Sequence, residues 1–166
     1  MRFLAAAIVN IVAAGVLWLS DQSGVIAGGS DFTADIIAPA MGARAVAGLV
    51  MACGFMLAAW RELPGGRLSR PAAATVAMLL LLLASHRVVV DAGRGVIRDI
   101  WLLVPAQSMT FDQSDGPQAS ASLDAGSGWD TLHPKAGGAT VVLLRGIPPL
   151  ALDLSSLERW WKPARS

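Results

Sequence analysis

Few residues in this sequence have side chains suited to catalysis or metal binding, and the clearest group is the pair His86 and Arg87. Nucleophilic catalysis needs a nucleophile, a base and a third residue that orients the base, and a zinc site needs three or four closely spaced ligands. His133 is the only other histidine, and neither histidine has acidic or thiol neighbours at a ligand spacing. We therefore expect no catalytic residue, no metal site and no cofactor.

The remaining candidates have simpler interpretations. Cys53 is the only cysteine and lies in an apolar run, where cysteine usually acts as a small hydrophobe. Asp91, Asp99 and Asp112 alternate with strand-like runs, which predicts solvated carboxylates in turns. The glycine turns AGRG and AGSG are not followed by a helix that could bind phosphate.

The composition is typical of a membrane protein. Hydrophobic residues make up 54% of the sequence and charged residues 15%, with a net charge of +1. A nucleic-acid surface needs a clustered basic stripe, and the sequence has none, so we expect no nucleic-acid partner. The abundance of alanine, glycine and arginine indicates a bacterial chain from a GC-rich genome.

Three apolar segments, at about residues 3–20, 45–61 and 71–86, predict transmembrane helices. Crossing a ~30 Å hydrocarbon core takes about 20 helical residues, so the short third segment spans only if its flanking arginines reach outward or the bilayer thins. Trp18 and Trp60 lie at segment ends, where tryptophan prefers the headgroup level. His86 and Arg87 would close the third span as interfacial residues, with a binding role as the alternative.

Small and polar residues inside these segments predict helix packing. Asn10 would face another helix or subunit, although a tolerated lone asparagine explains it equally well. Gly48 and Ala52 form a small-xxx-small face that lets a helix approach closely.

Loop charge predicts the orientation in the membrane. The arginine-rich loop at 61–70 would stay in the cytoplasm, and the linker after the first segment, which carries aspartates, would face outward. The N-terminus would then be cytoplasmic and the C-terminal domain periplasmic, in a multi-pass protein of the bacterial inner membrane. If the third segment only dips into the bilayer, the C-terminal domain is cytoplasmic instead.

Residues 87–166 have the short alternating runs of an antiparallel β-domain. We expect a hairpin over 86–104 with its turn at 92–95, a second hairpin over 139–154 with its turn at Gly146, and weaker strands at 108–112 and 120–124. The polar stretch 112–138 between them predicts a mobile loop in which Trp129 and His133 could contact a partner.

A short amphipathic helix should end the chain. Ser155 and Glu158 have capping-box spacing, and Pro163 stops the helix. Arg159, Trp160, Trp161 and Lys162 would lie at a membrane surface or against a partner. The predicted fold is thus a membrane α+β protein, with three transmembrane helices in 1–86 followed by a small antiparallel β-domain and a C-terminal helix.

The hairpin VVVDAGRGVIRD and the ending VVLLRGIPPLALDLSSLERWW resemble the membrane-anchored pleckstrin-homology-like proteins of bacteria. That family includes assembly factors for photosynthetic and other membrane complexes. The resemblance implies a scaffold with no active site.

Three functions follow from these observations. The first is a non-catalytic accessory or assembly subunit of a larger inner-membrane complex, with other inner-membrane subunits as partners. The second is a membrane-attached module that binds lipid or peptide. The third is an enzyme or transporter whose site the sequence does not reveal.

Overall fold

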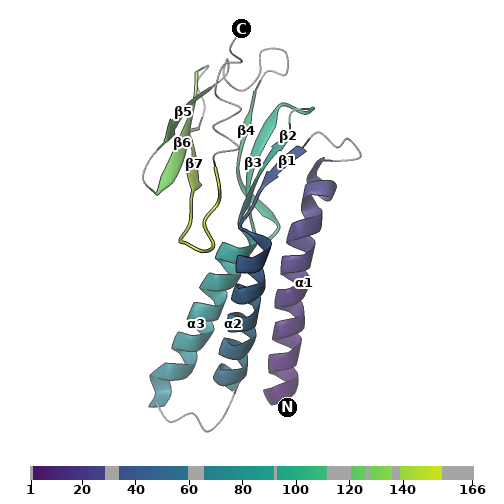
Figure 1. The fold of residues 1–166 in the computed structure, drawn as a ribbon, viewed down its shortest axis with the longest axis vertical. Coiled ribbons are helices and arrows are strands. Elements are labelled where there is room, and N and C mark those ends of the chain that lie inside the picture. Colours follow the sequence, from purple (N-terminus) through teal and green to yellow (C-terminus); the bar gives the residue numbers. More distant parts are fainter. Residues whose placement is uncertain are drawn as a thin grey trace.

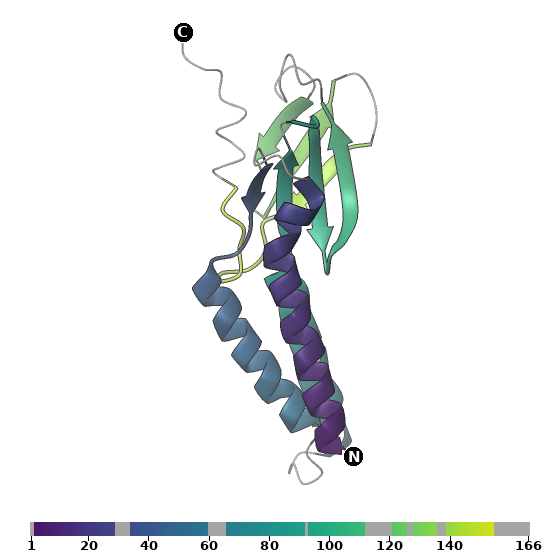
Figure 2. The same cartoon turned by 90° about the vertical axis from the view of Figure 1, so that its right-hand side faces the viewer.

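The computed structural model describes residues 2–28, 34–59, 66–91, 93–111, 121–125, 128–135 and 139–154. In these residues three helices lie side by side at one end of the molecule and two antiparallel sheets lie at the other (Figures 1 and 2). The elements are α1 (Arg2–Gly28), β1 (Ala34–Ile37), α2 (Met41–Ala59), α3 (Gly66–Ser85), β2 (Arg87–Asp91), β3 (Val96–Trp101), β4 (Val104–Thr110), β5 (Ala121–Ala125), β6 (Trp129–Pro134) and β7 (Val141–Leu144).

Small side chains bring the three helices together. Their shared core contains Ala13 of α1, Met51 of α2, and Ala77 and Leu81 of α3. At Gly54 of α2 an added Cβ would lie 3.4 Å from both the carbonyl oxygen of Ala73 and the Cβ of Ala77. Gly54 thus lies where α2 and α3 approach closely, with just enough room for a Cβ.

The residues predicted to pack helices take different positions in this bundle. Gly48 lies beside α1, since a Cβ there would be 3.8 Å from Cδ1 of Leu17. Asn10 and Ala52 are half-buried. Gly48 therefore lies next to a helix of the same chain, α1.

The prediction of three membrane-spanning helices is wrong. Across the described residues, no helix combines the length and the hydropathy needed to cross a bilayer. The helix α1 carries Asp21 and α2 carries Arg44, and the uncharged part of α3 after Arg70 runs only from Pro71 to Ser85. That part is about 22 Å long at ~1.5 Å per residue, shorter than a ~30 Å hydrocarbon core.

The location deduced from those spans is wrong for the same reason. A multi-pass inner-membrane protein with a cytoplasmic N-terminus and a periplasmic C-terminal domain requires helices that cross the bilayer. The described helices do not meet that requirement. The structure retains the predicted order of elements along the chain. Its three helices precede all of the described strands except β1.

The connection between α1 and α2 contributes a strand that the sequence did not predict. The first sheet has the order β1-β2-β3-β4, and β1 pairs antiparallel with β2 from Ala34 opposite Asp91 to Ile37 opposite Val88. The hairpin of α2 and α3 is therefore inserted between two neighbouring strands of one sheet (Figure 1). Residues 34–37 belong structurally with the β-region that was expected to begin at residue 87.

The second sheet, β5-β6-β7, packs against the first around one hydrophobic core. Val88, Val90 and Ile97 come from the first sheet, and Leu132 and Leu143 from the second. In β7 the buried Val141 and Leu143 alternate with the more exposed Val142 and Leu144, as expected for a strand with one face in the core. Gln107 of β4 also links the sheets, because its Oε1 accepts a hydrogen bond from the Val142 amide at 2.9 Å.

The structure confirms some of the predicted strands and corrects others. The turn near 92–95 is present, with Arg94 N donating to Asp91 Oδ1 and Gly95 at a φ of 62°. The stretch 112–138 is not one long loop, because β5 and β6 form a hairpin within it. The expected hairpin over 139–154 contains one strand, β7, followed by residues without strand structure. The predicted terminal helix over 155–163 lies outside the described residues.

The turn between β3 and β4 has unusual residues for its conformation. Trp101 pairs with Val104, so Leu102 and Leu103 form a two-residue turn with φ angles of 48° and 71°. Positive φ at both positions normally selects glycine or asparagine, because a Cβ crowds the following carbonyl. The side chain of Leu102 packs against the helix core, while Leu103 belongs to none of the described hydrophobic clusters.

This difference predicts opposite effects for the same substitution at adjacent positions. Leu103→Gly should raise the free energy of unfolding by up to about 1 kcal/mol, because it removes the left-handed backbone penalty and little packing. Leu102→Gly should lower it by about 1–2 kcal/mol, because the lost apolar burial exceeds the same relief. Urea denaturation of both variants measures this, and equal effects at the two positions would contradict the proposed role of Leu102.

Candidate functional site

Polar residues, most of them buried, collect where the helices meet the first sheet. We call this group the junction layer; its described members are Ser20, Asp21, Arg44, Ser85, His86, Arg87, Asp99 and Trp101. They come from all three helices and from β2 and β3. Burying polar groups costs free energy unless they are hydrogen-bonded, so their partners decide what this layer can do.

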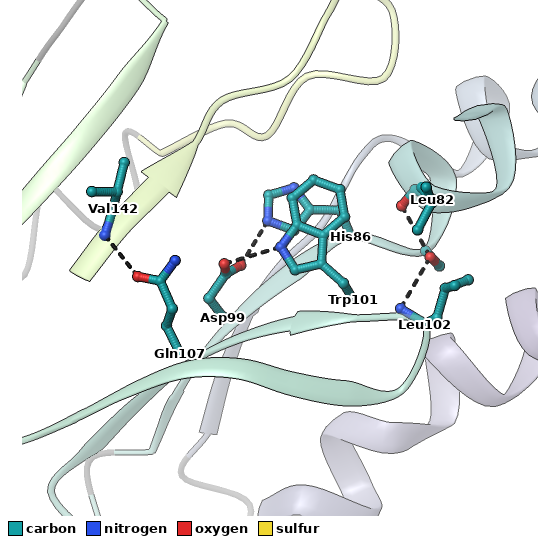
Figure 3. Close-up of polar contacts among 8 residues, drawn as sticks. Leu82, His86, Asp99, Trp101, Leu102, Gln107 and Val142 are labelled. Carbon is teal, nitrogen blue, oxygen red and sulfur yellow. Dashed lines mark hydrogen bonds and ion pairs between the residues drawn. The ribbon is translucent and has the colours of Figure 1, made fainter. Parts of the chain in front are cut away.

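One half of the junction layer is centred on Asp99. His86 Nε2 donates to Asp99 Oδ1 at 2.7 Å, and Trp101 Nε1 donates to Asp99 Oδ2 at 3.0 Å (Figure 3). The two rings stack, with centroids 3.8 Å apart and planes inclined by 15°. Because an ionised carboxylate only accepts hydrogen bonds, the contact assigns the proton of His86 to Nε2.

This arrangement holds the histidine rather than activating a nucleophile. The nearest hydroxyl along the chain, Ser85 Oγ, donates to the Leu82 carbonyl at 3.0 Å and accepts from the Leu102 amide at 3.4 Å (Figure 3). It is therefore engaged in closing the end of α3 onto the β3–β4 turn. His86 and Asp99 together fix the direction in which β2 leaves the helix.

The other half of the junction layer contains two arginines that both bind to α1. Arg87 Nη1 donates to the carbonyl oxygen of Ser20, and Arg44 Nη1 pairs with the carboxylate of Asp21. Burial lowers the pKa of Arg44, and it lowers the pKa of Arg87 to about 10 with a further contribution from the charge of Arg44. The two positive charges are therefore close enough to repel each other.

The interfacial interpretation of His86 and Arg87 is corrected by their burial. Each is only 1% exposed, and each contacts another part of this chain. A side chain that reaches toward a membrane surface must expose its polar end, which neither does. Asp99 is also buried, as is Asp91 at the end of β2, so the expectation of solvated turn carboxylates is wrong for both.

The other predicted contact residues lie apart from the junction layer. Trp18 is exposed on α1 and Trp129 is exposed at the start of β6. His133 is exposed further along β6. Cys53 is exposed on α2 instead of acting as a core hydrophobe. The remaining predicted contacts, and Asp112, lie outside the described residues: Trp60, Arg159, Trp160 and Trp161.

Sequence reasoning missed Arg44, Ser20 and Trp101 as members of the junction layer. Arg44 is a lone charge directly before the apolar segment 45–61, and Ser20 contributes a carbonyl oxygen, which any residue supplies. A signal was available at Asp99 and Trp101, because residues two apart in a strand lie on the same face and both have groups that bind histidine.

A second buried ion pair lies in the smaller sheet. Asp130 of β6 is fully buried, and its Oδ1 accepts from Nε and Nη2 of Arg145 at 2.9 and 2.7 Å. Within the described residues, no three histidine, cysteine or acidic side chains gather in a way that could hold a metal ion.

The comparisons with known proteins supply no family: no family model, no curated protein and no solved structure matches the chain. The resemblance to pleckstrin-homology-like proteins therefore stays a prediction.

The double contact of Asp99 predicts a large effect of removing its carboxylate. Asp99→Ala should lower the free energy of unfolding by about 2–4 kcal/mol, because the buried His86 and the partly buried Trp101 lose their shared acceptor. The control Asp124→Ala, on an exposed side chain of β5, should change it by less than about 0.5 kcal/mol. Denaturation curves measure the difference, and the Trp101 indole N–H resonance should move only in the Asp99 variant. Similar stability of the two variants would contradict this account.

Proposed function

We propose that this chain is a non-catalytic accessory subunit that binds an apolar helix of a partner protein along α1. The β-region would be held in a fixed orientation beside that partner by the junction layer. This keeps the accessory function expected from the sequence and does not require any described helix to cross a bilayer. The observation that carries the proposal is a regular row of apolar residues on α1 whose large side chains are exposed.

The row, which we call the α1 seam, consists of Leu4, Ile8, Ile11, Gly15 and Trp18. Its four large side chains are 66%, 52%, 71% and 63% exposed in chain order. Their spacing alternates between four and three residues, the repeat with which two helices pack side by side in a coiled coil. The seam belongs to a wider exposed apolar face that also includes Val9, Val12 and Leu19. Within that face, the regular repeat of the seam favours a helix as the occupant, over a flat surface or a small ligand.

The chemistry of the seam narrows the partner further. The sequence from Phe3 to Ser20 has no charged residue, so a partner helix with charges on its contact face would lose their hydration without compensation. A Cβ added at Gly15 would have no atom within 4 Å, so the seam is open at its centre. A large apolar side chain of the partner could fill that position as a knob fills a hole.

The junction layer supports the second part of the proposal. Arg87 joins the start of β2 to α1 through Ser20, and Leu102 joins the β3–β4 turn to the helix core. A helix bound along the seam would thus have the two sheets placed at a set position near its end. Scaffold proteins act by such positioning and need no reactive group of their own.

Site-specific cross-linking in the native cells tests the proposal. The full-length chain carries a photoreactive phenylalanine analogue at position 11, on the seam, or as a control at position 104, which is 63% exposed on β4. We expect a cross-link from position 11 to an uncharged apolar helix of one partner protein, present in a fixed ratio to this chain. Position 104 should not give that product.

A second variant separates binding from folding. Gly15→Met should leave the fold intact or stabilise it by up to about 1 kcal/mol, because methionine favours helix and the space is open. It should nevertheless reduce the cross-link at least tenfold by filling the hole. A product made only with a second copy of this chain or with lipid, or an unchanged yield with Gly15→Met, would overturn the proposal.

A further inference from the structure

The two arginines of the junction layer use only part of their hydrogen-bonding capacity. Nε and Nη2 of Arg44, and Nε and Nη2 of Arg87, are buried and have no hydrogen-bond partner in the described structure. The residues themselves are 7% and 1% exposed, so solvent does not reach these groups freely. Buried donors on a charged group are costly when unpaired, which marks this place as unusual in the molecule.

The unpaired atoms are the same on both arginines, and they form a recognisable edge. Nε and Nη2 carry two parallel N–H bonds along one side of the guanidinium, and this fork matches two oxygens of one oxyanion. Each arginine reaches α1 through Nη1 instead, Arg87 to the Ser20 carbonyl and Arg44 to the Asp21 carboxylate. The contacts to α1 therefore hold both side chains and leave the donors of both forks without a partner in the described structure.

Charge also favours an anion at this position. The two guanidinium groups carry two positive charges, and their described ion pairs include one carboxylate, Asp21, which is one-third exposed. The mutual repulsion of the arginines contributes to the lowered pKa of Arg87. An anion in contact with both guanidinium groups would offset that repulsion and compensate for the desolvation of both.

The number of donors distinguishes between classes of oxyanion. A carboxylate has two oxygens and is matched by one fork. A phosphate group has at least three strong acceptor oxygens and a charge near −2, so it can accept from two forks at once. The two forks belong to Arg44 and Arg87, whose side chains contact consecutive residues of α1. Two forks suit phosphate better than carboxylate.

We propose that Arg44 and Arg87 form a phosphate-binding site that joins α1, α2 and β2. The site lies at the end of the helices next to the sheet, and it does not depend on the α1 seam or on the proposed partner. Bound phosphate would stabilise the junction layer. The source of the group is either free inorganic phosphate or a phosphate monoester.

Calorimetric titration of the purified full-length chain with inorganic phosphate tests the site. We expect saturable binding that sodium chloride at equal ionic strength does not reproduce, and affinity for acetate at least tenfold weaker. The side-chain Nε–H resonances of Arg44 and Arg87 should shift with the same saturation curve. A parallel titration with glycerol phosphate identifies the source, because a fully enclosed site would bind only the free ion.

Matched variants locate the binding. Arg44→Lys and Arg87→Lys keep the charge but remove the fork, so each should weaken phosphate binding at least tenfold. Arg94→Lys, on an exposed arginine of the β2–β3 turn, should leave the affinity unchanged. If Arg87→Lys does not fold, Arg87→Met offers an apolar side chain for the buried position, and it should fold without binding phosphate.

Three results would overturn the proposal. The first is the absence of saturable binding beyond the effect of ionic strength. The second is unchanged binding in both lysine variants, which would place the ion elsewhere. The third is equal affinity for acetate and phosphate. None of these results bears on the partner helix, because the cross-linking experiment uses residues outside this site.

Discussion

The direct passage of the chain from α3 into β2 is the constraint on which the rest of the structure depends. The helix ends at Ser85 and the strand begins at Arg87, so His86 alone separates them. Successive residues entering a strand point to opposite sides. His86 meets Asp99 and Trp101 of β3, and Arg87 meets the Ser20 carbonyl of α1. Two neighbouring side chains thus fix the strand to the sheet and to the helices.

This constraint is costly, and packing offsets the cost. The two arginines keep unpaired N–H groups in a buried place, and Leu102 and Leu103 occupy a backbone region that disfavours leucine. The leucine turn is retained because Leu102 lies against the helix core, where no glycine could contribute the same apolar contact. The strained backbone and the buried charges thus lie on the same boundary between helices and sheets. Residues that are locally unfavourable in this way tend to occur at functional or strained sites.

Sequence analysis located the helices and the first β-turn well, because both depend on local patterns. The predicted segments at 3–20, 45–61 and 71–86 each fall within a helix or overlap most of one. The hydropathy of these segments does not reveal that Asp21 and Arg44, which lie beside them, form an ion pair. A segment was predicted to span the membrane from its apolar residues, without regard to the charges at its ends. The strand β1 has four residues, too few for a periodic signal, and it pairs with a strand more than fifty positions later.

The candidate site was harder to predict because its contacts join distant parts of the chain. Arg87 and Ser20 are 67 positions apart, and His86 and Asp99 are 13 apart. The sequence identified His86 and Arg87 as notable residues but gave no indication of what they contact. A backbone carbonyl such as that of Ser20 has no sequence signature, and Arg44 acquires its role only when α2 lies beside α1.

The position of β1 has a consequence for the integrity of the β-region. A fragment beginning at Arg87 would contain β2 to β7 but would lack β1. The outer edge of β2 would then lose its pairing from Val88 to Asp91. That edge carries three consecutive buried valines, and an unpaired apolar edge is a template for aggregation. The apparent boundary between helices and strands is therefore not a place where the chain divides into independent folding units. In the full chain, β1 covers this edge of β2.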